Sequence, residues 1–596
     1  MDIQTRVSKL QSLLQSKKLD GYVVPSADPH QSEYVADVWK RREFISGFSG
    51  SAGLFACTRG KAGLWTDGRY FIQAENELRG SSVTLMRQGA PGVPDWKEWM
   101  AQELPRGARL GVNLSLFSSE AFRQVQERMA SVGIQLEAQT LDLIDEVWGE
   151  QRPAFPSSPL REHALEYAGE SRESKLTRLR DAMRREGVRG LIVSALDEVA
   201  WLFNLRGADV SYNPVFYAFA LVTETQSTLF VSPSKVSEEL ITRLGSTVRW
   251  GDYDRFMDEL SRFKPHAPIW MDPATSSAAV EHALSSAGIE LHMKPTPIAA
   301  WKARKNLAEL RGMRDAHIRD GVAMLRFMAW FERAIATEAL DELKVAEQLE
   351  RFRRMAPEYI GPSFATIAGY GPNGALPHYR ATPESCLPLR TQSIFLLDSG
   401  GQYYDGTTDI TRTFACGTPT SEEKTIYTRV LKGHLLLKRS LFPAGTNGYQ
   451  LDVLARQPLW SAQLDYGHGT GHGVGAALCV HEGPFSVSLR KNLFPLEVGA
   501  VLSNEPACYR PGRFGVRIEN LVTVVEHGSS DWGSYLGMED LTLCPYERRL
   551  IDASLLQAEE IAQVDAYHQL VAQQLRDFLQ GDDLAFLERA TAPLGL

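Results

Sequence analysis

Four acidic residues and one histidine in the last third of the chain constrain its fold more than any other feature. These residues are Asp398, Asp409, His472, Glu505 and Glu519. Four ionised carboxylates gathered in a folded interior would repel one another and take up protons, unless about four positive charges lay among them. Two divalent cations supply that charge. We therefore expect a fold that brings these distant residues together around two metal ions.

The first two carboxylates lie on a predicted hairpin. Residues 393–397 form an apolar run that ends at Asp398, and residues 408–414, which include Asp409, alternate in the pattern of a second strand. Glycines punctuate the connection between them. Because alternate residues of a strand share a face and a turn reverses the chain, we expect both carboxylates on one face.

The second pair of carboxylates follows the same logic. Residues 500–504 form an apolar run that leads to Glu505, and residues 516–522, which include Glu519, are predicted to form one returning strand. Proline and glycine residues between the two runs predict a turn. This hairpin would again place two carboxylates near each other.

The histidine lies in a glycine-rich segment between the two hairpins. Residues 466–475 contain five glycines, and His472 stands among them. Glycine lets the backbone pass close to a site and adopt positive φ angles, at an entropic cost. An isolated histidine would more often have a structural role. Together with the four carboxylates, however, His472 is more readily explained as a metal ligand. Oxygen-rich ligation with one imidazole favours Mn²⁺, with Co²⁺, Fe²⁺ or Zn²⁺ as replacements.

The motifs around these residues resemble those of the pita-bread metallopeptidases, the family of methionine aminopeptidase, prolidase and Xaa-Pro aminopeptidase. They are D-S-G-G-Q-Y-Y-D-G-T-T-D, G-H-G-T-G-H-G-V-G, V-H-E-G-P, S-N-E-P and R-I-E-N. Within that family, the sequences of these motifs are most similar to those of the aminopeptidase P type. The resemblance implies that Asp398, Asp409, His472, Glu505 and Glu519 are the metal ligands, all five of which are present.

The resemblance also implies an activity and further site residues. It implies hydrolysis of the first peptide bond of peptides with proline at the second position, which releases the first amino acid. His378 and His481 match the proton-handling histidines, which suits an imidazole near neutral pH. Glu505 is the expected acceptor of the proton from the attacking water. His468 and Arg517 would orient the metal ligands from outside the ligand set.

The rest of the chain indicates additional domains. A pattern of helix, Gly turn, strand, helix and Gly occurs near residues 10–48 and again near residues 176–207, and each copy continues into apolar strands. We therefore predict an α/β (α+β) protein. Two creatinase-like α/β domains, residues 1–155 and 156–303, precede a pita-bread catalytic domain, residues 304–596, with a C-terminal extension from about residue 532.

Composition excludes some partners. A net charge of −9 and a pI of about 5.9 argue against a nucleic-acid-binding surface. Six cysteines without a C-x-x-C pair fit reduced thiols in the cytoplasm. No apolar run approaches the length of roughly 18 residues needed to span a membrane, and the polar N-terminus lacks a secretory signal. A cytoplasmic location is therefore expected, and the resemblance implies a homodimer.

Three other functions use related folds. A prolidase-type Xaa-Pro dipeptidase would employ the same five ligands, but it must also meet the free carboxylate of its substrate with a positive group. A metal-free enzyme like creatinase would not need the ligands. A non-catalytic peptide-binding pita-bread module typically lacks them, so the intact set counts against both.

Overall fold

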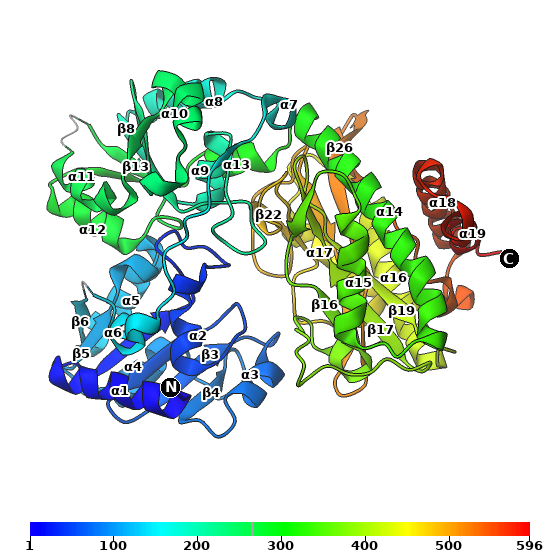
Figure 1. Cartoon of the computed structure of the whole chain (residues 1–596), viewed down its shortest axis with the longest axis horizontal. Helices are drawn as coiled ribbons and strands as arrows, with labels where there is room; N and C mark the ends of the chain where they lie inside the picture. Colours follow the sequence, from blue (N-terminus) through cyan, green and yellow to red (C-terminus); the bar gives the residue numbers. More distant parts are fainter. Residues whose placement is uncertain (140, 264–266, 596) are drawn as a thin grey trace. The chain divides into compact units, whose positions relative to one another are not determined.

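A computed structural model describes residues 1–139, 141–263 and 267–595, and the chain divides into two compact units (Figure 1). Unit 1 comprises Met1–Glu162, Glu170–Ser211 and Val215–Ile298. Unit 2 comprises His163–Gly169, Tyr212–Pro214 and Ala299–Leu596.

Unit 1 begins with a six-stranded sheet in the order β4-β3-β2-β1-β5-β6. Its strands are β1 (Gly21–Pro25), β2 (Leu54–Thr58), β3 (Ala62–Thr66), β4 (Val83–Arg87), β5 (Arg109–Val112) and β6 (Gln135–Ala138). Both faces are buried. Tyr22 and Val24 pack into one apolar cluster with helix α1 (Ile3–Ser16), and Val23 packs into another with helix α5 (Ser119–Val132). This alternation explains why β1 reads as an unbroken apolar run.

A second sheet of unit 1 repeats this plan, with the order β12-β11-β10-β8-β13-β14. Its strands are β8 (Gly190–Val193), β10 (Ala218–Thr223), β11 (Ser227–Val231), β12 (Arg249–Gly251), β13 (Ile269–Met271) and β14 (Leu291–Met293). In each sheet the first strand, β1 or β8, pairs antiparallel with the next long strand and parallel with a later one. The repeat predicted from the sequence is therefore present as two sheets of identical topology.

Unit 2 is built around two sheets. The smaller has the order β16-β17-β19, and the larger has the order β20-β27-β26-β23-β21-β22. The strands of the smaller sheet are β16 (Ile367–Tyr370), β17 (Ile394–Ser399) and β19 (Ile410–Ala415). Those of the larger are β20 (Phe442–Pro443), β21 (Gly471–Gly473), β22 (Glu482–Val487), β23 (Val501–Asn504), β26 (Asn520–Ser530) and β27 (Gly533–Asp540). Two short pairs accompany them: β15 (Tyr359–Pro362) with β18 (Gly401–Tyr403), and β24 (Ala507–Arg510) with β25 (Phe514–Arg517).

Long helices cover these sheets. They are α14 (Leu307–Thr337), α15 (Glu342–Arg354), α16 (Ser421–Arg439), α17 (Gly448–Trp460), α18 (Ala558–Leu575) and α19 (Gly581–Ala590). A capping box formed by Asn306 and Glu309 begins α14, close to the start expected for the catalytic domain. Phe331 of α14 lies 5.6 Å, between ring centroids, from Phe395 of β17, so an aromatic core fixes this helix to the smaller sheet.

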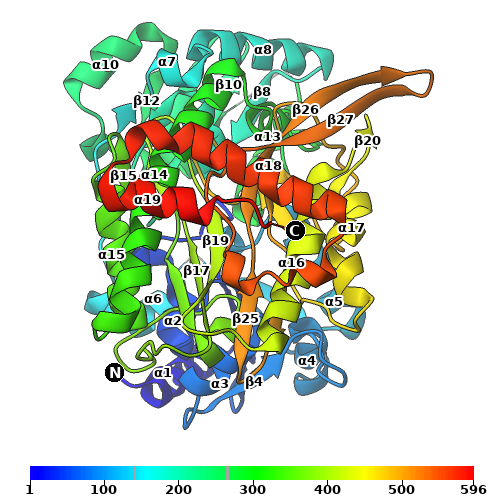
Figure 2. The same cartoon turned by 90° about the vertical axis from the view of Figure 1, so that its right-hand side faces the viewer.

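The C-terminal segment belongs structurally to unit 2. Strand β27 pairs with β26, and the tip of this hairpin, which carries exposed Trp532, extends past the neighbouring strands (Figure 2). The following helices α18 and α19 lie beside each other and contact α14 (Figure 2). The proposed extension from about residue 532 therefore starts inside a β-hairpin of the larger sheet and continues into these two helices.

The second predicted hairpin differs from the observed one. The expected single strand over residues 516–522 is divided into β25 and β26, with Ile518 and Glu519 between them. The reason is a change of partner. β25 pairs with β24, β26 pairs with β23, and the backbone N–H of Glu519 donates to Thr411 O of β19 in between. A single regular strand could not form hydrogen bonds with β24, β19 and β23 in turn, so the strand is interrupted at Ile518 and Glu519.

The cysteines and the helices bear on two further expectations. All six cysteines are free thiols. In the part of the chain that the structure describes, no helix combines the length and the apolar character that a bilayer crossing requires.

Candidate metal centre and active site

Three of the predicted carboxylates are brought together by the pairing of β17 with β19. Asp398 lies opposite Thr411 in the antiparallel register, and Asp409 lies two residues before Thr411. Residues opposite one another, and residues two apart on one strand, share a face of the sheet. Glu519 reaches this face through an isolated bridge to Thr411, whose hydroxyl donates to Glu519 Oε2 at 2.7 Å.

The two glutamates lie where strands change partners. Glu505 follows β23 and precedes β24, and its backbone N–H donates to Thr470 O at 2.8 Å. Glu519 lies at the equivalent break between β25 and β26. A break of this kind turns a side chain out of the regular alternation, so both carboxylates can face the smaller sheet.

His472 completes the group from β21. Its Nδ1 lies 3.0 Å from Gly473 O, and because a carbonyl only accepts, Nδ1 carries the proton. Nε2 is then the unprotonated atom, and it lies 3.6 Å from Asp409 Oδ2 and 3.5 Å from Glu505 Oε1. A lone pair facing two carboxylates at these distances is repulsive, and a cation between them would remove the conflict.

The donor atoms fit metal ions. Asp409, His472 and Glu519 each offer one ligand atom, and these atoms lie within 4.8 Å of one another. Asp398 Oδ1, Asp409 Oδ1 and Glu519 Oε1 are buried and accept no hydrogen bond within the described part of the chain. Buried carboxylate oxygens without partners are costly, and coordination of hard divalent cations satisfies them.

The electrostatics of the group support the same reading. Burial, and then the neighbouring carboxylates, raise the pKa of Asp409 well above its ordinary value. The same two causes raise the pKa of Glu519. These raised pKa values mean that the ionised carboxylates are disfavoured in the absence of positive charge, whereas metal ions among them would favour the ionised form. The donor set therefore fits two divalent cations.

The two histidines predicted to handle protons, His378 and His481, have different surroundings. His481, half-buried just before β22, packs edge-on against His472 with ring centroids 4.4 Å apart. His378 is also half-buried and lies in the segment between β16 and β17. That segment is held by Glu342, which accepts hydrogen bonds from Asn373 and from Tyr379, the residue that follows His378. Its carboxylate therefore fixes the backbone around His378.

His468 and Arg517 are joined through Tyr509. His468 Nδ1 donates to Gly469 O, so the Tyr509 hydroxyl donates to His468 Nε2 at 2.8 Å. The same Tyr509 oxygen accepts from Arg517 Nη1, and Arg517 Nη2 donates to Asp398 Oδ2. A continuous chain of hydrogen bonds thus runs from His468 to one of the candidate ligands.

The glycines near His472 serve close approach and not unusual backbone angles. A Cβ at Gly471 would lie 2.0 Å from Ser503 O, and one at Gly473 would lie 2.2 Å from Glu482 O. None of the five glycines between residues 466 and 475 has a positive φ. The expectation of close backbone passage is therefore correct, and the expectation of positive φ is wrong here.

Sequence reasoning did not predict the contacts of three polar residues of the site. Thr411 contacts both Glu519 and Arg517, Tyr509 joins His468 to Arg517, and Ser503 donates to Glu505 Oε1 at 3.2 Å. Thr411 and Ser503 each lie two positions from a candidate ligand, and residues two apart on a strand share a face. This spacing could have indicated that both side chains lie near the ligands. Tyr509 had no such signal, because its partners come from other segments.

Family models match nearly the whole chain. Residues 311–526 match metallopeptidase family M24, and residues 534–594 match the C-terminal region of peptidase M24. Residues 6–144 and 151–309 each match a creatinase/prolidase N-terminal domain. The two sheets of unit 1 thus correspond to two separate matches.

Named relatives cover the same length. A probable Xaa-Pro aminopeptidase P of Botryotinia fuckeliana is 43% identical over 99% of this chain and 92% of its own. Aminopeptidase P2 of Arabidopsis thaliana is 43% identical over 94% of this chain and 84% of its own. The solved structure of X-prolyl aminopeptidase from Caenorhabditis elegans, described as a cytosolic enzyme with a di-nuclear active site, superposes with a TM-score of 0.95. The two sequences are 34% identical, and the alignment covers 100% of both chains.

Proposed function

The chain belongs to metallopeptidase family M24, and from that premise we propose that it removes the first residue from peptides whose second residue is proline. It is a metal-dependent aminopeptidase of the Xaa-Pro type. The observation that carries this function is the buried carboxylate group, in which three oxygens have no hydrogen-bond partner among the described residues, in a chain similar to such enzymes over its full length.

Two divalent metal ions are the cofactors. Asp398, Asp409, His472, Glu505 and Glu519 are the proposed ligands, and Mn²⁺ is the proposed metal because oxygen donors dominate the set. When bound, such ions act as Lewis acids toward the scissile carbonyl and lower the pKa of water. Arg517, which is buried, donates to Asp398 Oδ2, and Asp398 Oδ1 accepts no hydrogen bond from the described residues, so Oδ1 is the oxygen most available to a metal.

The chain's own residues handle protons and orientation. Glu505 is the proposed proton acceptor, because its side chain is 17% exposed while Asp409 and Glu519 are almost fully buried. The Ser503 hydroxyl donates to Glu505 Oε1, which orients the carboxylate. A partly exposed carboxylate can meet both water and the buried group.

The histidines complete the proposed reaction. The leaving nitrogen of any peptide bond must receive a proton when the bond breaks, and here that nitrogen belongs to the proline ring. His481 and His378 are the proposed donors to the developing oxyanion and to this leaving nitrogen. His468 and Arg517 would orient the site from outside the ligand set.

A cleavage assay tests the function. Purified, metal-stripped protein is incubated with Xaa-Pro dipeptides, longer Xaa-Pro peptides and Xaa-Ala controls, with and without Mn²⁺, Co²⁺, Fe²⁺ or Zn²⁺, and products are identified by mass spectrometry. Metal-dependent release of the first residue from longer Xaa-Pro peptides is expected. Cleavage restricted to dipeptides would identify a prolidase, and no cleavage with any metal would favour a peptide-binding module.

The remaining proposals concern organisation. The domains are proposed to be residues 1–155, 156–303 and 304–596, and the enzyme is proposed to act in the cytoplasm without nucleic-acid partners. A homodimer is proposed because α17 exposes an apolar face formed by Tyr449, Val453 and Trp460, which are between 40% and 43% exposed. Sedimentation of Val453→Glu should then give a monomer, while Met355→Glu, which replaces an exposed apolar residue directly after α15, should not.

A further inference from the structure

Arg456 is a buried arginine of α17 to which the proposed reaction assigns no role. It is 1% exposed, and it pairs with Asp452, one helical turn earlier and 0% exposed. Arg456 Nε donates to Asp452 Oδ2 at 2.6 Å, and Nη2 lies 3.4 Å from Oδ1. This pair uses only part of the guanidinium, so the remaining N–H groups are available to another segment.

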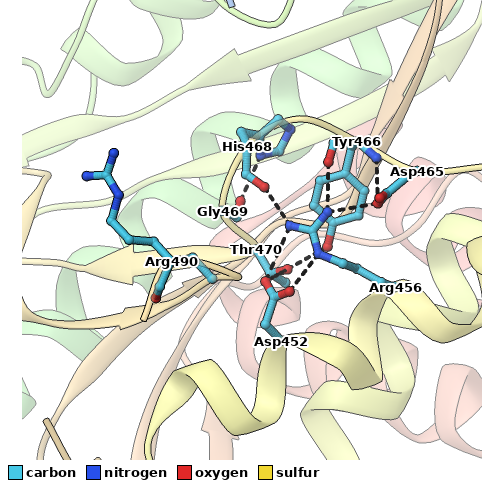
Figure 3. A network of polar contacts seen from close by, with 9 residues as sticks. Asp452, Arg456, Asp465, Tyr466, His468, Gly469, Thr470 and Arg490 are labelled. Carbon is cyan, nitrogen blue, oxygen red and sulfur yellow. Dashed lines mark hydrogen bonds and ion pairs between the residues drawn. The ribbon is translucent and has the colours of Figure 1, made fainter. Parts of the chain in front are cut away.

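Those N–H groups hold the loop that carries His468. Arg456 Nη1 donates to Tyr466 O at 2.7 Å and to Asp465 Oδ1 at 2.8 Å, and Nη2 donates to His468 O at 2.6 Å (Figure 3). The guanidinium carbon also lies 3.9 Å from the centre of the Tyr466 ring. All three nitrogens are therefore engaged, and a planar fork of fixed geometry fits two carbonyls and two carboxylates at once.

Asp452 fixes the other end of the same loop. The Thr470 hydroxyl donates to Asp452 Oδ1 at 2.6 Å, and Thr470 O accepts the backbone N–H of Glu505. Thr470 is fully buried. The pair on α17 thus sets the backbone of residues 465–470 at both ends, two residues before His472 and directly against Glu505.

The direction of the His468 side chain follows from this arrangement. Its carbonyl is turned toward Arg456, while its imidazole meets the Tyr509 hydroxyl, which also accepts from Arg517. If the carbonyl were released, the loop could rotate and separate the imidazole from Tyr509. We propose that Arg456 is a positioning residue that fixes loop 465–470 and thereby holds His468 in the site. The activity readouts below rest on the proposed function.

A purely structural role makes a different prediction. Buried ion pairs can often be replaced by apolar residues at little cost in stability. The fold by itself would therefore not require the pair of Arg456 and Asp452. If Arg456 acts through His468, the effects of changing the two residues on activity should not add. If it only stabilises the domain, they should be independent.

The test uses the full-length, metal-loaded protein with Arg456→Lys, which keeps the charge but loses the planar fork. We expect kcat/KM to fall about 10- to 100-fold, as for residues that support a metal site from outside. His468→Ala should lower kcat/KM in the wild type by a similar factor, yet by less than about threefold in the Arg456→Lys background. Arg490→Gln is the control, because Arg490 is exposed beside the loop and its side chain points away from the network (Figure 3).

A second readout needs no catalysis. Hydrogen exchange of the amides in residues 465–471 should be at least about tenfold faster in Arg456→Lys than in the wild type or Arg490→Gln, because the loop opens locally. Asp452→Leu combined with Arg456→Met removes both buried charges and guards against simple misfolding. This double variant should still unfold in one cooperative thermal transition and should still show the faster exchange and the lower kcat/KM.

Several results would overturn the inference. They are unchanged exchange of the amides in residues 465–471, multiplicative effects of Arg456→Lys and His468→Ala, or a His468→Ala variant with full activity. A wild-type protein that cleaves no Xaa-Pro peptide would instead refute the proposed function, and the exchange experiment would still decide whether Arg456 fixes the loop.

Discussion

His481 packs edge-on against His472, with the two ring centroids 4.4 Å apart and the planes inclined by 77°. The first ring is a proposed proton donor and the second a proposed metal ligand. Edge contact places the two imidazoles in one site without requiring that both bind metal. Adjacent imidazoles are therefore proposed to have different roles: His481 donates a proton, and His472 binds a metal.

Replacement of His481 should reduce catalysis without loss of metal. In His481→Ala we expect kcat/KM to fall about 10²- to 10⁴-fold, the range for a lost general acid or base. Metal content, measured by plasma mass spectrometry after gel filtration, should stay at the wild-type value. A loss of metal in this variant would instead identify His481 as a ligand.

Replacement of Glu519 should separate the metal-free from the metal-bound protein. Because burial and neighbouring carboxylates raise its pKa, Glu519→Gln should leave the metal-free protein as stable as the wild type or more stable. At about 100 times its Kd a bound metal adds about 2.7 kcal/mol to wild-type stability. In the variant, the same Mn²⁺ concentration should add less than about 1 kcal/mol in chemical unfolding. An undiminished gain would remove Glu519 from the ligand set.

Glu342 should matter for activity through the His378 segment. Its buried carboxylate accepts from Tyr370 N, Leu387 N, Asn373 and the Tyr379 hydroxyl. Tyr379→Phe removes one of these contacts and should lower kcat about tenfold, with metal content unchanged. Tyr370→Phe is the control, because the Tyr370 hydroxyl bonds Gln392 O and not Glu342. Equal activity of both variants would show that Glu342 serves the fold alone.

Glu482 should be a strong determinant of stability. It follows His481 and pairs with two buried lysines, Lys302 and Lys305. Glu482→Gln leaves both ammonium groups without that carboxylate, and removal of one partner from a buried pair costs about 3–5 kcal/mol. Glu497→Gln breaks a surface pair with Arg304 and should cost under about 1 kcal/mol. Urea unfolding of both variants compares the two costs directly, and similar costs would contradict the burial argument.

His434 should make stability depend on pH. Burial, and then the charge of Arg412, lower its pKa from 6.5 to about 3. The folded protein keeps the ring neutral while the unfolded chain binds a proton, so this contribution is complete above pH 6.5 and is lost as pH falls toward 3. His434→Gln should therefore show a shallower loss of stability below pH 6.5, by about 1.4 kcal/mol per pH unit. Parallel curves from urea unfolding at pH 7.5 to 4.5 would contradict this.

Much of the fold was predictable because its signals are local. The run from Tyr22 to Pro25 is apolar throughout, as a strand buried on both faces must be, and the copy from Gly190 to Val193 reads the same way. The hairpin of β17 and β19 was predictable for the same reason. The division of residues 516–522 was not, because it depends on a hydrogen bond from Glu519 to Thr411, a residue in another strand.

The sequence by itself determined the chemistry of the donor set and the two α/β repeats, since residue type and periodicity are properties of the chain alone. Only the tertiary structure decided which groups hold that set in place. Arg517 reaches Asp398 across 119 positions, Tyr509 reaches His468 across 41, and the Arg456 fork is satisfied only when the loop folds over it. Such hydrogen bonds become strong only after burial excludes water, and burial is a property of the assembled fold.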